Sequence, residues 1–279
     1  MASEEEQYFA QVQRHLLRSR GMDLSGYSPS FVMRAIRKRI GRSDSESYAA
    51  YVKLLLRSEQ ETNELLNALS INVTEFFRDK GAFEAFQAKA IRPLLQQKTV
   101  SPGGILRIWS AGCGTGQETY TLGICLLEEL KSIESASPPI VSVVGTDISK
   151  AAIAKAKRGI YSADEVKNVP GRFLGEYFRP AGEGYEVSEA LRKRTRFHLE
   201  NLLDPPSSKF FDAIVCRNVL IYFSRPSHEL VLRNLHDALR AGGYLMLGRT
   251  EALVGEMRSR YDIVDQENRI LRKRSVQVS

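Results

Sequence analysis

The chain has 279 residues, of which 43% are hydrophobic and 26% charged, a composition typical of a globular protein with one large domain and a smaller one. No apolar run is long enough to span a membrane and the N-terminal sequence MASEEEQY is acidic, unlike a secretory signal, so we expect a cytoplasmic protein. The three cysteines form no C-x-x-C pair and the four histidines are scattered, which predicts no disulfide framework and no metal site.

The net charge of +7 is concentrated near the N-terminus. Between Arg14 and Arg42 lie eight basic residues and one acid, an excess equal to that of the whole chain. In Ser30–Gly41 apolar residues recur at helical spacing, and basic residues lie on the other side. This basic face consists of Arg34, Arg37 and Lys38. Such a face is usually only solvated, but it can also dock nucleic acid or an acidic protein helix. Because no aromatic residues are interleaved with it, we favour a protein partner.

Residues 1–97 are predicted to form an N-terminal helical domain and a linker. Helical apolar spacing, interrupted by glycine and proline, runs through Glu4–Arg20, Ser30–Ile40, Ser45–Arg57 and Glu59–Leu69. The segment that follows, Ile71–Phe83, mixes polar side chains with phenylalanines. Its aromatic residues can fill a seam between domains while its polar residues cap a helix, or the polar residues can reach into a ligand site.

Residues 98–279 are predicted to form an α/β domain. After the Pro/Gly-rich stretch Lys98–Gly104, strands alternate with helices, which is typical of a mostly parallel sheet with helices on both faces. The predicted strands are Ile105–Ser110, Ile140–Thr146, Thr195–Leu199, Ala213–Cys216 and Tyr244–Leu247, with later candidates at Tyr261–Val264 and Arg269–Arg272. The helix after the fourth strand is predicted to begin near Ser224 and to end at Gly242-Gly243. An insertion at about residues 160–194 is expected to hold a small antiparallel hairpin around Pro180–Gly184.

The first candidate site follows the first strand, where Gly112, Gly114 and Gly116 alternate before a helix predicted at Thr119–Leu130. Glycine permits a sharp turn and the close approach of a ligand, and the N–H groups that open the helix favour an anionic or polar ligand group. A glycine turn can also serve only to connect a strand to a helix. The G-x-G-x-G spacing differs from the dinucleotide fingerprint, which disfavours a dehydrogenase.

Other candidate residues also follow predicted strands, at the edge of the sheet where ligands bind. Asp147 follows the second strand, where a carboxylate can accept hydrogen bonds from both hydroxyls of a ribose. With the glycine loop it suggests a nucleoside ligand without pyrophosphate, such as S-adenosylmethionine. Asn201-Leu202 follows the third strand, and Arg217-Asn218 directly follows the buried fourth strand. The polar groups of Arg217 and Asn218 must therefore form hydrogen bonds with a ligand or with the local backbone. Tyr222, one turn later, faces the same site or is a core residue.

The motifs NVTEFFR, AGCGTGQE, GTDIS, NLL and CRNVLIYF, in this order after an N-terminal helical domain, resemble the chemotaxis receptor methyltransferases (CheR), which are protein-glutamate O-methyltransferases. The resemblance runs from about Ser30 to about Leu271. It implies a class I, Rossmann-like fold, S-adenosylmethionine as cofactor and S-adenosylhomocysteine as product. It also implies methylation of glutamates in the cytoplasmic helical domain of a chemoreceptor, in chemotaxis signal transduction. The cofactor-site residues that it implies are Asn72, Thr74, Arg78, Glu118, Asp147, Asn201, Leu202 and Asn218, to which we add Gly112, Gly114 and Arg217.

The resemblance also implies roles around the acceptor. Arg78 and Tyr222 would flank the transferred methyl group, and the basic face would hold the receptor's methylation helix. A glutamate has a pKa of about 4.3 in water, so it is already a nucleophile at neutral pH and needs no general base. We therefore expect Arg78 to position the carboxylate. Some family members bind a peptide tether at the receptor's C-terminus through the hairpin, but the turn is short in this chain, and we expect no tether binding.

Two other functions fit part of this pattern. A nucleic-acid methyltransferase would use the same cofactor, but amino-group methylation usually shows an Asn/Asp-Pro-Pro-aromatic motif where this chain has CRNVLIYF. Cys216 is not preceded by proline, as a cytosine-C5 nucleophile would be. A non-catalytic cofactor-sensing or docking protein is the other alternative, since binding residues alone do not establish turnover. We expect no nucleic-acid partner and no insertion into a membrane.

Overall fold

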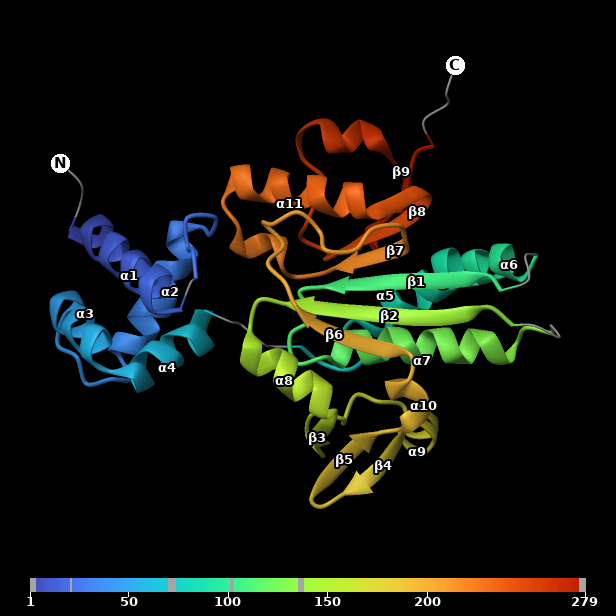
Figure 1. Cartoon of the computed structure of the whole chain (residues 1–279), viewed down its shortest axis with the longest axis horizontal. Coiled ribbons are helices and arrows are strands. Elements are labelled where there is room, and N and C mark those ends of the chain that lie inside the picture. Colours follow the sequence, from blue (N-terminus) through green and yellow to red (C-terminus); the bar gives the residue numbers. More distant parts are fainter. Residues whose placement is uncertain (1–3, 21, 70–73, 101–102, 135–137, 276–279) are drawn as a thin grey trace. The chain divides into compact units, whose positions relative to one another are not determined.

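The computed structural model describes residues 4–20, 22–69, 74–100, 103–134 and 138–275, and the chain divides into two compact units (Figure 1). The helical unit consists of residues 1–72 together with Tyr222–Glu229, and the sheet unit of Val73–Ile221 together with residues 230–279. The expected domain boundary lay at residue 97, whereas the division falls at residue 72. The reason is that Phe83, Phe86 and Leu94 share a core with the sheet. None of the helices in the described ranges is long and apolar enough to cross a membrane.

The helical unit has an apolar core formed by one face of each helix. Its described helices are α1 (Glu4–Arg20), α2 (Pro29–Ile40), α3 (Tyr48–Arg57) and α4 (Glu59–Leu69). The bounds of α1 and α4 are those predicted. Helix α3 begins at Tyr48 rather than Ser45, because the hydroxyl of Ser47 accepts a hydrogen bond from the backbone N–H of Ala50 at 3.2 Å and caps the helix there.

A buried ion pair joins α2 to α4 inside the helical unit. The guanidinium of Arg39 donates to both carboxylate oxygens of Glu61, at 2.8 and 2.7 Å. The Tyr51 hydroxyl donates to the same carboxylate at 3.0 Å. Burial alone would raise the pKa of Glu61, but the hydrogen bonds from Arg39 and Tyr51 outweigh it and hold that pKa below its ordinary value. Arg39 is thus a buried structural residue, whereas Arg34, Arg37 and Lys38 of the basic face are exposed.

The segment Tyr222–Glu229 completes the core of the helical unit from far along the sequence. Its aromatic rings pack on α2 and on the segment before it: the rings of Tyr222 and Phe31 in α2 lie 4.7 Å apart, and those of Phe223 and Tyr27 before the helix 5.3 Å apart. A backbone bridge also pairs Tyr27 with Phe223. The helical unit is therefore built from two stretches that are distant in sequence.

In the sheet unit, the described strands form a seven-stranded sheet in the order β6-β2-β1-β7-β8-β10-β9. These strands are β1 (Ile105–Ala111), β2 (Ile140–Asp147), β6 (Thr195–Leu199), β7 (Phe211–Cys216), β8 (Leu239–Leu247), β9 (Tyr261–Asp265) and β10 (Ile270–Lys273). The pairs from β6 to β8 are parallel, and β10 pairs antiparallel with both β8 and β9. The strand order turns back beside β1, which places the ends of β1, β2 and β7 where such sheets bind ligands. The prediction of a mostly parallel α/β sheet with an N-terminal helical domain is confirmed.

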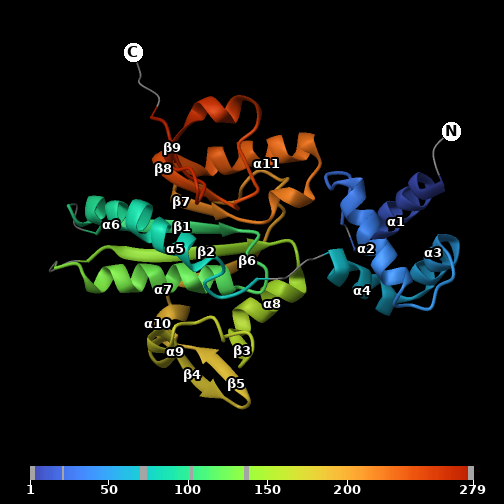
Figure 2. The same ribbon diagram turned by 180° about the vertical axis from the view of Figure 1, so that it is seen from behind.

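Helices cover this sheet, and α5, α6 and α7 lie in front of the strands in the rear view (Figure 2). The described helices of the sheet unit are α5 (Lys80–Phe86), η1 (Gln87–Ile91), α6 (Arg92–Thr99), α7 (Gln117–Lys131), α8 (Lys150–Arg158), α9 (Gly171–Tyr177), α10 (Glu189–Arg192), η2 (Leu220–Tyr222), α11 (Arg225–Ala238) and η3 (Gly255–Arg260); η2 and α11 extend into the segment of the helical unit. A Cβ on Gly145 would lie 2.5 Å from the hydroxyl of Thr119, so glycine allows α7 to approach β2 closely. Arg92 and Gln87 donate to the buried carboxylate of Glu129 and fasten η1 and α6 to α7.

The predicted end of α11 is wrong. The helix ends at Ala238, and Gly242-Gly243 lies inside β8, which begins at Leu239. The register between β7 and β8 shifts near this point, and a Cβ on Gly243 would lie 2.9 Å from the carbonyl oxygen of Asp212. The glycine pair therefore serves the close approach of two strands rather than the termination of a helix.

A small antiparallel sheet, in the order β3-β5-β4, follows α8 and lies below α7 and α8 in both views (Figures 1 and 2). Its strands are β3 (Ile160–Ser162), β4 (Phe178–Ala181) and β5 (Gly184–Val187). Ala181 pairs with Gly184, which leaves a two-residue turn with Gly182 at a φ of 58°. The predicted antiparallel β insertion is confirmed, whereas β3 was not predicted.

Candidate cofactor site

The glycine loop after β1 is packed closely within the sheet unit. Gly112, Gly114 and Gly116 have φ values of 77°, 56° and 99°. A Cβ on Gly112 would lie 2.5 Å from a methyl group of Val219, in the turn after β7. A Cβ on Gly116 would lie 2.8 Å from the side chain of Ala156, in α8. Both the left-handed backbone and the close contacts therefore require glycine at these two positions.

Asp147, at the end of β2, lies directly beside the glycine loop. One carboxylate oxygen accepts the backbone N–H of Gly114 at 2.9 Å, and the other accepts the N–H of Ser149 at 2.8 Å. Burial raises the pKa of Asp147, although these backbone hydrogen bonds oppose the shift. Each oxygen of a carboxylate has two lone pairs, so this one can still accept hydrogen bonds from two hydroxyl groups. This arrangement fits a ribose next to the loop.

Glu118, in the first turn of α7, is a second half-buried carboxylate of the site. It accepts a hydrogen bond from the Ser110 hydroxyl at 2.8 Å. Burial raises the pKa of Glu118 to about 7, and the nearby carboxylate of Glu251 adds to this shift. The charges of Arg217 and Arg78 and the Ser110 hydrogen bond act in the opposite direction. A cationic ligand group bound nearby would favour the ionised form of Glu118.

The pKa of Glu118 leads to a prediction about stability. Between pH 5 and pH 8 the wild-type chain should lose roughly 2–3 kcal/mol of unfolding free energy relative to Glu118→Gln. The unfolded glutamate ionises above pH 4.5, whereas the folded one stays protonated up to about pH 7, so its contribution is present at low pH and lost as the pH rises. Urea titrations followed by the fluorescence of Trp109, the single tryptophan, would measure both proteins. A difference that does not vary with pH would contradict this assignment.

The turn Thr74–Asp79, here called the finger turn, is anchored to the sheet unit by its aromatic residues. Phe76 packs edge-on against Tyr161 at 5.0 Å, and Phe77 stacks on Phe173 at 5.6 Å. The N–H of Phe77 donates to the hydroxyl of Thr121 in α7, at 3.1 Å. The predicted cofactor residues Thr74 and Arg78 are both half-buried in this turn. Asn72 lies outside the described residues.

Arg217 holds the finger turn through its contacts with Arg78 and Asp79. Its side chain is 2% exposed and forms an ion pair with Asp79 at 2.5 Å, while it also donates to the carbonyl of Arg78 at 3.1 Å. Its guanidinium carbon lies 5.2 Å from the centre of the Phe83 ring. Among the described residues the Nε of Arg217 has no hydrogen-bond partner, although it is buried. A polar ligand at this point would satisfy that donor. The sequence indicated Arg217 as a ligand contact but not as the support of Arg78.

The three remaining predicted contacts follow β6 and β7. Asn201 accepts the N–H of Leu203 at 3.1 Å and so organises the turn after β6, and Leu202 is buried there. Asn218 has a φ of 59°, a left-handed conformation that asparagine tolerates better than most residues. The structure thus brings Gly114 into contact with Asp147 and Arg217 into contact with Arg78, while Asn201, Leu202 and Asn218 lie at the ends of neighbouring strands.

Two sets of predicted residues belong to the helical unit. Tyr222 is half-buried on Phe31, so its predicted role beside the methyl group stays a prediction. The basic face of α2 is exposed at all three positions, Arg34, Arg37 and Lys38. Arg37 also donates to the Tyr48 hydroxyl at 2.7 Å. No group of three or more His, Cys, Asp or Glu residues that could hold a metal ion occurs in the described part of the chain.

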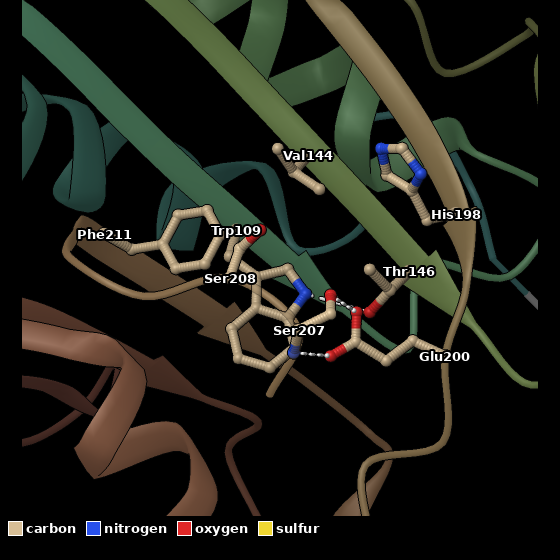
Figure 3. A pocket seen from close by; sticks show the side chains of 8 residues that line it. All are labelled: Trp109, Val144, Thr146, His198, Glu200, Ser207, Ser208 and Phe211. Atoms are coloured by element: carbon tan, nitrogen blue, oxygen red, sulfur yellow. Dashed lines mark hydrogen bonds between the residues drawn. The ribbon is translucent and has the colours of Figure 1, made fainter. Parts of the chain in front are cut away.

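A pocket of about 70 Å³ is lined by residues of β1, β2, β6 and β7 and of the segment between β6 and β7 (Figure 3). Trp109 donates to the Thr146 hydroxyl at 2.9 Å, and Ser207 donates to Glu200 at 3.0 Å. The carbonyl of Thr146 accepts the N–H groups that begin the glycine loop, at 2.8 and 2.9 Å. The predicted cofactor residues are not among those drawn around it. This pocket therefore lies beside Thr146, the residue whose carbonyl holds the start of the glycine loop.

Family models match nearly the whole chain. Residues 72–270 match the model described as "CheR methyltransferase, SAM binding domain", and residues 7–70 match "CheR methyltransferase, all-alpha domain". The parallel sheet, the glycine loop with its carboxylate and this match define a methyltransferase that uses S-adenosylmethionine as its cofactor. The chain belongs to the CheR methyltransferase family, which confirms the resemblance found in the sequence.

Individual relatives agree with this assignment. The chain is 29% identical to chemotaxis protein methyltransferase 2 of Vibrio cholerae over 251 residues, which covers 88% of this chain and 85% of the relative. It is 36% identical to chemotaxis protein methyltransferase Cher2 of Pseudomonas putida over 195 residues, or 69% of this chain and 70% of the relative. An uncharacterized 104.1 kDa protein of Rhodobacter capsulatus is 34% identical over 244 residues, covering 88% of this chain. The aligned region makes up 25% of that longer protein.

Proposed function

We propose that this methyltransferase acts on glutamate carboxylates in the cytoplasmic helical domain of a chemoreceptor and forms glutamate methyl esters, with S-adenosylhomocysteine as the second product. The family match of both the SAM-binding and the all-alpha part carries this proposal, because a cofactor-binding domain alone would suit many substrates. Relatives named chemotaxis protein methyltransferases support the substrate class. The enzyme would therefore act on this receptor domain in the cytoplasm.

The cofactor is proposed to bind at the carboxyl ends of β1, β2, β6 and β7. When bound, it supplies a methyl group on a sulfonium ion, which a carboxylate oxygen can attack. Asp147 would accept hydrogen bonds from the ribose, with the N–H of Gly114 holding the carboxylate in place. Glu118 would stabilise a positive group of the cofactor, because its carboxylate ionises more readily beside a cation.

Arg78 is proposed to bind the acceptor glutamate. A guanidinium can hold a carboxylate through two hydrogen bonds, and such positioning is the main requirement of a reaction whose nucleophile is already ionised. The ion pair between Arg217 and Asp79 supports the turn that carries Arg78. Esterification removes the negative charge of the glutamate and weakens its attraction to Arg78, which favours release of the product. Tyr222 is proposed as the second residue near the methyl group.

The basic face of α2 is proposed to dock the receptor. Its three cationic side chains, Arg34, Arg37 and Lys38, are exposed on one helix, which suits a helical partner with acidic residues. Exposed charges of this kind contribute mainly to the rate of association and to specificity, and their effect falls with ionic strength.

A labelling experiment tests the proposed function. The purified chain would be incubated with S-adenosylmethionine tritiated on the methyl group and with membranes that contain a chemoreceptor. Label that appears on the receptor and leaves as methanol in mild base would support a glutamate methyl ester. Label on RNA or DNA alone would contradict the proposed substrate, and tight cofactor binding without any transfer would favour a cofactor-sensing protein.

Asp147→Ala should weaken the binding of S-adenosylhomocysteine about 10- to 100-fold, because a carboxylate acceptor is lost and two backbone N–H groups lose their partner. Isothermal titration calorimetry would measure the dissociation constant. The control is Asp164→Ala, which removes a carboxylate that is exposed and pairs with the exposed Lys167. Equal affinities for wild type and Asp147→Ala would exclude Asp147 as a cofactor contact.

Binding of a C-terminal receptor pentapeptide tether is expected to be absent. The hairpin between β4 and β5 has a turn of only two residues, and the family resemblance implies a longer turn in members that bind the tether. Calorimetric titration of the chain with such a pentapeptide should give no saturable heat, and saturable binding would refute the expectation.

A further inference from the structure

The turn that follows β7 is held by one buried carboxylate, that of Glu251. Its Oε2 accepts the N–H of Asn218 at 3.0 Å, and its Oε1 accepts the N–H groups of Val219 and Leu220 at 2.8 and 2.7 Å. The N–H of Gly248 also donates to Oε2, at 2.6 Å. Glu251 is 2% exposed, so water cannot replace these hydrogen bonds.

The loop after β8 brings the carboxylate of Glu251 next to the turn at Asn218. The N–H of Glu251 donates to the carbonyl of Gly248 at 2.9 Å, which closes a tight turn. A Cβ on Gly248 would lie 2.6 Å from the carboxylate of Glu251 and 2.9 Å from the backbone nitrogen of Asn218. Glycine is therefore required at position 248, because a side chain would separate the two turns.

The turn at Asn218 needs such support. Asn218 is held at a φ of 59°, a conformation that costs energy and persists only when its surroundings impose it. The next residue, Val219, packs against Gly112 of the glycine loop. A displacement of the turn would therefore move both Asn218 and one wall of the loop.

We propose that Glu251 is a positioning residue for the cofactor site: it fixes the turn Asn218–Leu220 against the glycine loop and thereby sets the affinity for S-adenosylmethionine. This inference rests on the proposed role of Asn218 as a cofactor contact. Glu251 lies beyond the motifs that indicated the site in the sequence, and it acts through the backbone of the turn rather than by touching the cofactor.

The variant Glu251→Gln tests this role with almost no change in shape. Whichever way the amide is oriented, its NH₂ group faces two backbone N–H donors that previously had an acceptor. We expect the dissociation constant for S-adenosylhomocysteine to rise about 10- to 100-fold. Native-state hydrogen exchange should show reduced protection at the amides of Asn218, Val219 and Leu220.

The matched control is Glu129→Gln, the same change at a carboxylate that is also buried. Glu129 accepts hydrogen bonds from Arg92 and Gln87, so it holds helices together away from the strand ends. If Glu251 has a purely structural role, the two variants should lose similar thermal stability and should both bind the cofactor almost as tightly as the wild type. A positioning role predicts a loss of affinity for Glu251→Gln alone, with a higher KM for the cofactor and a smaller change in kcat.

Gly248→Ala provides a second variant that keeps the carboxylate but displaces it, and it should weaken cofactor binding in the same direction. Unchanged affinity in both Glu251→Gln and Gly248→Ala would overturn the inference. Because the readout is cofactor binding, this outcome differs from failure of the proposed function, in which the wild-type chain binds the cofactor but does not methylate a receptor.

Discussion

Arg78→Ala is expected to lower the rate of receptor methylation by on the order of 10²–10³-fold, as found when an enzyme loses one fixed donor to a reacting group. Arg78 is carried by a turn that Arg217, Phe76 and Phe77 hold in place, so the backbone that presents its side chain is fixed before the acceptor arrives. The loss should appear mainly in kcat/KM for the receptor. Binding of S-adenosylhomocysteine should fall much less, because Asp147 and the glycine loop are unchanged.

The control for this variant is Lys80→Ala. Lys80 is two residues away, 65% exposed, and pairs with the exposed Glu84. Its removal takes away the same charge from the same region of the chain and should leave methylation within about twofold of the wild-type rate. A similar loss of activity in both variants would indicate a general effect of positive charge, and an unaffected Arg78→Ala would exclude a role for Arg78 in transfer.

Arg39→Ala is expected to destabilise the helical unit by about 3–5 kcal/mol, which is the usual cost of leaving one partner of a buried ion pair alone. The Glu61 carboxylate would lose two of its hydrogen bonds and keep the one from Tyr51. Loss of helical circular dichroism with increasing urea would measure the effect. Arg39→Met, which retains most of the apolar volume, should lose nearly as much stability if the unpaired charge is the cause.

The adjacent residue Lys38 offers the control. Lys38 is exposed on the same helix, so Lys38→Ala should change the unfolding free energy by less than about 0.5 kcal/mol. If Lys38 helps to dock the receptor, the same variant should slow methylation at low ionic strength. These results would show that Arg39 stabilises the helical unit, whereas its neighbour Lys38 binds a partner.

The sequence predicted much of the sheet because buried parallel strands are continuous apolar runs. The predicted strand Ala213–Cys216 lies within β7, in which every residue is buried. The predicted strand Thr195–Leu199 also coincides with β6, although only Thr195 and Phe197 are buried there. The three residues of β3 were missed, since so short a segment has no periodicity, and its pairing with β5 depends on the insertion as a whole. Gly242-Gly243 was mistaken for a helix end because the same residues also permit close strand contacts.

Candidate site residues could be selected because the ends of parallel strands meet at one edge of the sheet. The contact between Gly114 and Asp147 follows from that rule. The pairing of Arg217 with Asp79, and of Glu251 with the turn at Asn218, could not be predicted, because each joins segments far apart in sequence through side chains that no local pattern relates. These contacts depend on tertiary structure alone.

The contribution of Tyr222–Glu229 to the helical unit has a consequence for synthesis of the chain. Domains generally fold in order as they leave the ribosome, N-terminal first. Here the aromatic cluster around Phe31 lacks Tyr222 and Phe223 until most of the chain has been made. The first helices must therefore wait with apolar surface uncovered while β1, β2, β6 and β7 emerge. A fragment that ends at residue 72 would keep that surface permanently, which makes it prone to aggregation and a natural target for chaperones.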